Sequence, residues 1–122
     1  MMLPQVMLAL TVILGLASAG RGTVYYQDGA KGSCGQANTD DAIIAAISNS
    51  WMHFESPSPY CGRQIEVKNV GSDDQVGGAG KTLTVTVADT CPSCGPDDVD
   101  LSIGAWNSLT GNAEYGTFDA QW

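Results

Sequence analysis

The stretch Val85-Thr86-Val87-Ala88-Asp89-Thr90-Cys91-Pro92-Ser93-Cys94 runs from an apolar strand pattern into two closely spaced cysteines. Shortly afterwards, Val99-Asp100-Leu101-Ser102 sets a second carboxylate between apolar residues. A carboxylate next to buried apolar residues is costly unless a partner satisfies it. In the structural interpretation Asp89 bonds turn amides and Asp100 caps a helix. In the functional interpretation the two carboxylates form a site.

The chain of 122 residues is acidic, with 13 Asp and Glu against 5 Lys and Arg and a formal net charge of −8. Proteins that bind duplex nucleic acid or anionic membranes present clustered cations to phosphate groups, and five scattered cations cannot do so. Apolar residues make up 43% of the chain, which argues against disorder. We therefore expect a small globular monomer with neither nucleic-acid nor membrane partners.

Residues 1–19 are predicted to be a secretory signal peptide that is removed. An apolar run from Val6 to Leu16 is followed by Ala17-Ser18-Ala19, an A-x-A cleavage pattern. The run is too short to span a membrane. We therefore expect a secreted, extracellular protein with one domain over residues 20–122.

The cysteines are even in number, which in an oxidising compartment predicts two disulfides. Four cysteines allow three pairings, and their spacing does not select one. Cys91 and Cys94 also form a C-x-x-C pair, but a zinc site needs four ligands and the single histidine, His53, is not at ligand spacing. We therefore expect neither a metal nor a cofactor. The four residues are Cys34, Cys61, Cys91 and Cys94.

Alternating apolar residues predict two strands in the middle of the chain. Residues 64–68 and 82–87 both show the period of a half-buried strand. The polar, glycine-rich segment 71–80 between them is predicted to be a hairpin loop.

The flanking segments add further short elements. Strands are expected over 23–26 and 118–122, whereas 40–48 suits either a helix or a buried strand. Ser102 is predicted to cap a short helix that Gly111 ends. Short strands with glycine turns indicate an all-β fold with one or two short helices, arranged as a compact barrel.

Four motifs follow one another along the chain: Gly32-Ser33-Cys34-Gly35, Cys61-Gly62-Arg63, Val87-Ala88-Asp89-Thr90-Cys91 and Val99-Asp100-Leu101-Ser102. In this order they resemble the double-psi β-barrel family, which includes barwin, rare-lipoprotein-A-like domains, the first domain of expansins and small endoglucanases. The chain is most similar to the loosenins, single-domain fungal relatives of expansins, over residues 22–122. The resemblance implies a six-stranded barrel with a shallow polysaccharide groove across one face.

The resemblance also implies roles for individual residues. Asp100 matches the carboxylate that expansins need and that related endoglucanases use as a general acid, and Asp89 matches the second groove aspartate. Two neighbouring carboxylates disfavour joint ionisation and raise one apparent pKa. Tyr25 and Tyr26 fall on the family's aromatic first strand and are expected to line the groove, and Asp28 beyond them is a further candidate for substrate contact.

A disulfide pairing follows from the resemblance as well. Cys34 and Cys61 match a disulfide of the family, which leaves Cys91 to pair with Cys94. The chain departs from the family at two points, because the family often has a threonine near Val24 and a groove aromatic near Cys91.

The position of the general base separates loosening from hydrolysis. In the related endoglucanases this base follows the first-strand aromatics, where the present chain has Gln27 and then Asp28. An amide cannot take a proton from water, and a shift of one residue in a strand reverses the face of a side chain. The sequence therefore favours a protein that loosens cellulose or chitin without hydrolysis. Two alternatives stay open: a glycoside hydrolase with Asp100 as acid and Asp28 as base, and a protein-binding module such as a protease inhibitor or effector.

Further aromatic residues are candidates for sugar contact. The run Trp51-Met52-His53-Phe54 suits either packing at the rim of the fold or stacking on a sugar. Trp106 is a candidate substrate-binding residue, although its helical spacing from Leu109 is also typical of a core residue.

Overall fold

The computed structural model describes residues 19–122, and its longest strands are β3 (Gln64–Gly71) and β4 (Thr82–Cys91). These strands pair antiparallel, with Ile65 opposite Val85. The hairpin predicted from the alternating pattern is therefore confirmed. The predicted signal peptide falls, except for its last residue, outside the described residues.

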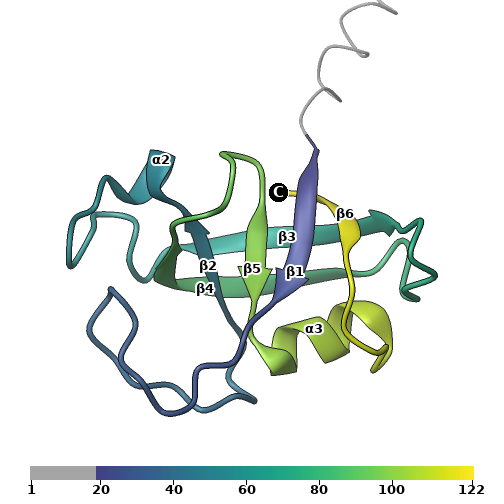
Figure 1. The fold of residues 1–122 in the computed structure, drawn as a ribbon, viewed down its shortest axis with the longest axis horizontal. Coiled ribbons are helices and arrows are strands. Elements are labelled where there is room, and N and C mark those ends of the chain that lie inside the picture. The colour runs from purple at the N-terminus through teal and green to yellow at the C-terminus, as the bar shows by residue number, and fades with distance from the viewer. Residues whose placement is uncertain (1–18) are drawn as a thin grey trace, which may run out of the picture.

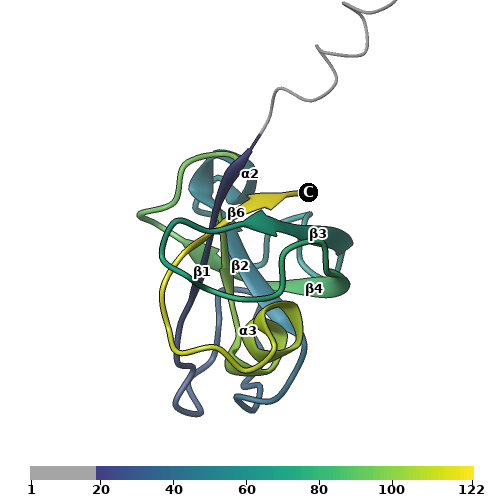
Figure 2. The same cartoon turned by 90° about the vertical axis from the view of Figure 1, so that its right-hand side faces the viewer.

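Four shorter strands complete a closed barrel: β1 (Gly20–Val24), β2 (Ile44–Ser48), β5 (Val99–Leu101) and β6 (Phe118–Gln121). Around the barrel the strands follow the order β1-β5-β2-β4-β3-β6 (Figures 1 and 2). The pairs β1–β5 and β2–β4 run parallel, and the other neighbouring pairs run antiparallel. The prediction of a mainly β, six-stranded barrel is confirmed.

The segment that suited either a helix or a buried strand forms strand β2. It lies between β4 and β5 and pairs with both, and all five of its residues are buried. Ala45 and Ile47 belong to the core cluster, so the alternation of a strand places Ala46 on the outer face. A strand that is covered on both faces has no polar side, which is why its period was ambiguous in the sequence.

The first strand begins earlier than predicted. Its residues from Gly20 to Gly22 pair with β6, and residues 22–24 pair with β5. Glycine at 22 is needed here, because a Cβ atom would lie 2.5 Å from the ring of Phe118. Glycine is depleted in strands, so propensity did not indicate this start. Tyr25 and Tyr26 consequently follow β1 and do not lie on it, which corrects the prediction of a strand over 23–26.

Two short helices accompany the barrel, α2 (Asn49–Met52) and α3 (Ile103–Thr110). The ends of α3 are as predicted: the Ser102 hydroxyl accepts a hydrogen bond from the N–H of Ala105 at 3.2 Å, and Gly111 has a left-handed φ of 71°. In Figures 1 and 2, α3 lies across the lower end of the barrel. Within residues 19–122, neither helix has the length and apolar character needed to cross a membrane.

The core is filled by side chains from β2 to β6 and from both helices, with Trp106 as the largest. Trp106 is fully buried, its ring centroid lies 5.5 Å from that of Phe118, and its indole N–H donates to the carbonyl of Ala113 at 3.0 Å. The prediction that Trp106 contacts substrate is therefore wrong. Its apolar area stabilises the core.

The disulfides are Cys34–Cys61 and Cys91–Cys94, the pairing that the family resemblance implied. The first joins residues 27 positions apart in the sequence, and the second joins residues only 3 positions apart. A disulfide stabilises mainly by restricting the unfolded chain, and the restriction grows with the length of the closed loop.

Replacing both cysteines of one pair by serine should show this difference. We expect the Cys34/Cys61 variant to lose about 3–4 kcal/mol of unfolding free energy and the Cys91/Cys94 variant to lose about 2 kcal/mol. Urea unfolding of the two variants and the wild type measures both losses. Equal losses, or a larger loss for the short loop, would contradict the chain-entropy argument.

Candidate functional site

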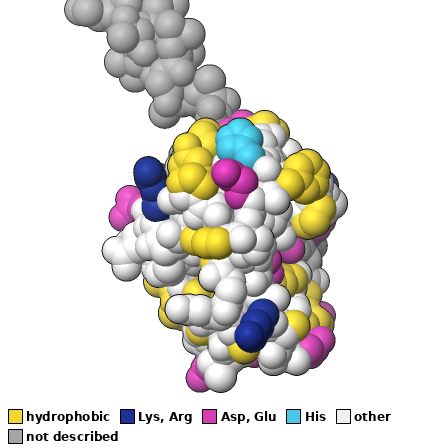
Figure 3. Space-filling view, turned by 90° about the vertical axis from the view of Figure 1, so that its left-hand side faces the viewer, with side chains coloured by type: hydrophobic (Ala, Val, Ile, Leu, Met, Phe, Trp, Pro, Cys, Tyr) yellow, Lys and Arg dark blue, Asp and Glu magenta, His cyan; other side chains and the backbone are white. Residues whose placement is uncertain are grey.

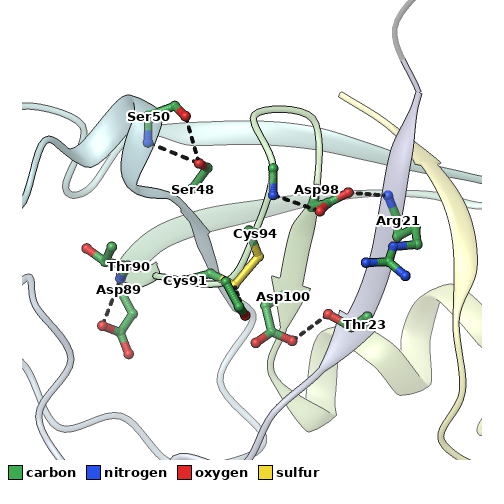
Figure 4. Close-up of a disulfide and its surroundings, with 12 residues drawn as sticks. Arg21, Thr23, Ser48, Ser50, Asp89, Thr90, Cys91, Cys94, Asp98 and Asp100 are labelled. Atoms are coloured by element: carbon green, nitrogen blue, oxygen red, sulfur yellow. Dashed lines mark hydrogen bonds between the residues drawn. A yellow bond between two sulfur atoms is a disulfide. The ribbon is translucent and has the colours of Figure 1, made fainter.

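A row of four paired residues crosses the outer face of the barrel. Thr23 on β1 pairs with Asp100 on β5, which pairs with Ala46 on β2, and Ala46 pairs in turn with Asp89 on β4. Paired residues direct their side chains to the same face of a sheet, so the two carboxylates flank the small Ala46. Figure 4 shows Asp89 and Asp100 on the strands to either side. With a spacing of about 4.8 Å between strands, the backbones of Asp89 and Asp100 lie roughly 10 Å apart. The structure thus brings together the two predicted carboxylates.

A β-bulge in β4 turns Asp89 to this outer face. Ala45 pairs with Val87, but the next residue, Ala46, pairs with Asp89, so that Ala88 is an extra residue in β4. Val87 belongs to the core cluster, and regular alternation would have directed Asp89 inward as well. The bulge resolves this conflict, and bulges are common next to functional sites for this reason.

Asp89 is held by backbone amides. Its Oδ1 accepts hydrogen bonds from the N–H groups of Ser33 and Thr90, both at 2.8 Å. Gly32 allows the loop to come this close, because a Cβ atom there would lie 2.6 Å from the carbonyl oxygen of Ala88 and 2.9 Å from Cγ of Asp89. The structural interpretation of Asp89, a bond to turn amides, is thereby confirmed. Its Oδ2 makes no hydrogen bond within residues 19–122 and is left as an acceptor.

The structural interpretation of Asp100 as a helix cap is wrong, because Ser102 occupies the cap position of α3. Instead, Oδ1 of Asp100 accepts a hydrogen bond from the hydroxyl of Thr23 at 2.7 Å. Burial raises the pKa of Asp100 above its usual value, the bond from Thr23 lowers it, and the charge of Asp89 raises it further.

Tyr25 lies close to both carboxylates. Burial raises the pKa of its phenol strongly, and the negative charges of Asp89 and Asp100 raise it further, so the hydroxyl keeps its proton. The hydroxyl is buried and has no hydrogen-bond partner among the described residues. A buried hydroxyl without a partner costs free energy, and a ligand that bonds to it would recover that cost.

The other residues predicted beside Tyr25 lie in different surroundings. Tyr26 is 59% exposed, and its ring packs edge-on against Tyr115 at 5.8 Å. Gln27 is buried, and its side-chain amide donates to the carbonyl of Thr39 at 3.0 Å, so it ties two loop segments together. Asp28 is exposed and has a positive φ of 51° in the turn that follows. Substrate contact by Tyr26 and Asp28 stays a prediction.

A small pocket of about 90 Å³ opens beside Asp100. Figure 4 shows the Cys91–Cys94 disulfide above and between the two carboxylates. The pocket is lined by Arg21, Thr23, Cys91, Ser93, Cys94, Asp98 and Asp100.

Asp98 is a residue of this site whose role the sequence did not indicate. Its two carboxylate oxygens accept hydrogen bonds from the backbone N–H groups of Arg21 and Gly95, each at 2.8 Å. Asp98 thereby fixes the wall of the pocket to the start of β1. Within residues 19–122, no group of three or more His, Cys, Asp or Glu side chains is arranged to hold a metal ion.

Solved structures with this architecture are known. The Streptomyces papain inhibitor superposes with a TM-score of 0.62 and 25% identity over 86% of this chain and 94% of the inhibitor. A mutant expansin of Clavibacter michiganensis in complex with cellohexaose gives the same TM-score and identity over 84% of this chain and 47% of the expansin. Both have the double-psi β-barrel, or barwin-like, fold. The chain is a double-psi β-barrel protein. A beta-1,4-D-endoglucanase from the blue mussel Mytilus edulis shares this fold at 22% identity and a TM-score of 0.56, over 85% of this chain and 77% of the endoglucanase.

This double-psi β-barrel protein also has relatives in sequence. The papain inhibitor of Streptomyces mobaraensis is 34% identical over 101 residues, which cover 79% of this chain and 63% of the inhibitor. An "Allergen Asp f 7 homolog" of Arthroderma benhamiae is 32% identical over 84 residues, which cover 66% of this chain and 26% of that protein. The chain therefore spans between about a quarter and just under two thirds of these relatives. No protein-family model matches it.

The raised pKa of Asp100 predicts how stability changes with pH. The folded state binds this proton more tightly than the unfolded state, so the contribution of Asp100 to stability is fully present below pH 3.8 and is lost as the pH rises through the raised pKa. Asp100→Asn removes this titration and keeps an oxygen for the bond from Thr23. We therefore expect the unfolding free energy of the variant to fall less than that of the wild type between about pH 3.5 and pH 7.

Denaturant unfolding at several pH values measures this difference. The matched control is Asp73→Asn, which changes an exposed carboxylate in the loop between β3 and β4. The same pH profile in the Asp100 variant and the wild type would show that the burial of Asp100 has no energetic consequence.

Proposed function

We propose that this protein binds a neutral cell-wall polysaccharide, cellulose or chitin, in the groove around Asp89 and Asp100 and loosens it without hydrolysis, as expansins and loosenins do. The observation that carries the proposal is the row Thr23–Asp100–Ala46–Asp89 with the unpaired hydroxyl of Tyr25 beside it. The expansin neighbour, whose solved complex contains cellohexaose, supports a saccharide as the ligand.

The chemistry of the groove suits sugar hydroxyls. A hydroxyl group both donates and accepts, and here it would meet carboxylate oxygens as acceptors and the Tyr25 phenol as a donor. Hydrogen bonds to a charged group contribute about 1.5–3 kcal/mol each. If the groove binds a separated chain more tightly than a packed one, binding shifts the polymer toward separation with no bond broken.

The surroundings of Gln27 and Asp28 favour loosening over hydrolysis. A glycoside hydrolase that inverts the anomeric centre needs, besides the general acid, a carboxylate base that activates a water molecule on the opposite face of the sugar ring. Gln27 cannot serve as this base, because an amide does not take a proton from water and its side chain is bonded to Thr39. Asp28 lies in an exposed turn. Asp100 would then act as a ligand for sugar hydroxyls and not as a general acid.

Secretion belongs to the same proposal. Cys34–Cys61 and Cys91–Cys94 are both oxidised, and disulfides of this kind form and persist in oxidising compartments. Together with the predicted signal peptide over residues 1–19, this supports an extracellular protein. A monomeric state stays a prediction.

A combined binding and release assay tests the proposed function. The wild type should be depleted from solution by amorphous cellulose or chitin, weaken a cellulose network under load, and release no reducing sugar. Asp100→Asn and Asp89→Asn should each lower the affinity about tenfold, which corresponds to about 1.4 kcal/mol. Asp73→Asn, on an exposed loop, should bind like the wild type. Soluble oligosaccharides that appear with the wild type and not with Asp100→Asn would instead establish a glycoside hydrolase.

Inhibition of a cysteine protease is the second candidate function. It is favoured by the 34% identity to the papain inhibitor of Streptomyces mobaraensis and by a structural match that covers 94% of the solved inhibitor. Titration of papain with the purified protein tests it directly. Under the polysaccharide proposal, papain keeps its activity at a severalfold excess of this protein. Stoichiometric inhibition of papain without binding to either polysaccharide would replace the first proposal by the second.

A further inference from the structure

Two tryptophans hold the loop that forms the wall of the Asp100 pocket. The indole N–H of Trp51, in α2, donates to the carbonyl of Pro96 at 2.7 Å, and that of Trp122, after β6, donates to the carbonyl of Asp97 at 3.0 Å. An indole has one polar group, and in both residues the backbone satisfies it. What these side chains present to solvent is therefore apolar ring surface.

The tryptophans belong to a set of three aromatic residues, Trp51, Tyr60 and Trp122, which we call the aromatic array. The centroid of the Trp51 ring lies 5.9 Å from that of Tyr60 and 6.0 Å from that of Trp122. Trp122 is 37% exposed, and the other two are partly exposed. The guanidinium of Arg63 lies 4.9 Å from the centroid of the Tyr60 ring and covers part of it. Figure 3 shows separate hydrophobic patches at the upper end of the face that carries α2, with the histidine and an acidic side chain between them.

The array adjoins the proposed groove through the loop it holds. Pro96 and Asp97 accept the indole bonds, and the next residue, Asp98, lines the pocket beside Asp100. The loop is further fixed by the Cys91–Cys94 disulfide and by the two backbone bonds to Asp98. The array and the Asp100 pocket therefore contact the same short loop, at Pro96 and Asp97 on the one hand and at Asp98 on the other.

We propose that the aromatic array is a second polysaccharide contact, which extends the groove and takes a single, uncharged polysaccharide chain. This inference rests on the proposed function. The C–H groups on the face of a pyranose ring are apolar and pack against aromatic rings, and exposed apolar patches of this kind mark interaction sites. The planes of Tyr60 and Trp122 are inclined to that of Trp51 by 71° and 59°. Because the rings are not coplanar, the array fits one chain better than the flat face of a crystal.

Two variants of Trp122 separate ring contact from loop positioning. Trp122→Phe keeps an aromatic ring and loses the N–H bond to Asp97, whereas Trp122→Ala loses both. We expect Trp122→Ala to weaken binding to amorphous cellulose and chitin about fivefold or more, as truncation of an interface aromatic commonly does, and Trp122→Phe to stay within about twofold of the wild type. Val70→Ala is the control, because Val70 on β3 is 38% exposed and lies outside the array and the groove.

Depletion from solution onto each polymer is the readout, and thermal unfolding of every variant confirms that it folds. Wild-type affinity of Trp122→Ala would overturn the inference and leave the proposed function standing. Equal losses for Trp122→Ala and Trp122→Phe would also overturn it, because loop positioning would then explain the effect. A wild type that binds neither polymer would remove both proposals. A larger loss when Trp122→Ala is combined with Asp100→Asn than with either change alone would support two separate contacts.

Discussion

The pairing of β2 with β4 on one side and β5 on the other determines the geometry of the candidate site. Ala46 is the residue at which both ladders meet, since it is paired with Asp89 and with Asp100. This position requires the bulge at Ala88, because without the extra residue the side chain of Asp89 would point toward the core, where a carboxylate without a partner is costly. Ala46 is itself a small, buried residue between the two carboxylates, so the backbone pairings of β2 set how far apart Asp89 and Asp100 lie.

The loops around the row Thr23–Asp100–Ala46–Asp89 are held by side chains that form hydrogen bonds to a second segment of the chain. Oδ1 of Asp89 joins β4 to the loop at Ser33, and Asp98 joins the start of β1 to the loop that follows β4. The indoles of Trp51 and Trp122 donate to two carbonyls of that same loop, those of Pro96 and Asp97. Such restraints preorganise a binding surface, which lowers the entropy lost when a ligand binds. The same hydrogen bonds hold the loop beside the Asp100 pocket in place, although this loop has no regular secondary structure.

Barrels of this architecture carry different functions, and the fold alone does not distinguish a protease inhibitor from an expansin. What distinguishes them is the chemistry on the surface. Here, two carboxylates lie on either side of β2 and a buried phenol lies close to both. Burial raises the pKa of Asp100 and of Tyr25, and the charge of Asp89 raises both further. Three aromatic rings lie together next to the adjoining loop, to which two of them are hydrogen-bonded. This combination of acceptors, a donor and apolar ring surface is suited to a sugar polymer.

Local sequence patterns predicted the β3–β4 hairpin and both ends of α3, because alternation, the serine N-cap and the glycine C-cap act over a few residues. The ordered motifs led to the barrel, the disulfide pairing and the two aspartates. The identity of β2 as a strand, the start of β1, the core position of Trp106 and the roles of Ala46 and Asp98 did not follow from the sequence. Each depends on which distant segment lies alongside, and pairing between strands far apart in the chain exists only once the barrel has closed.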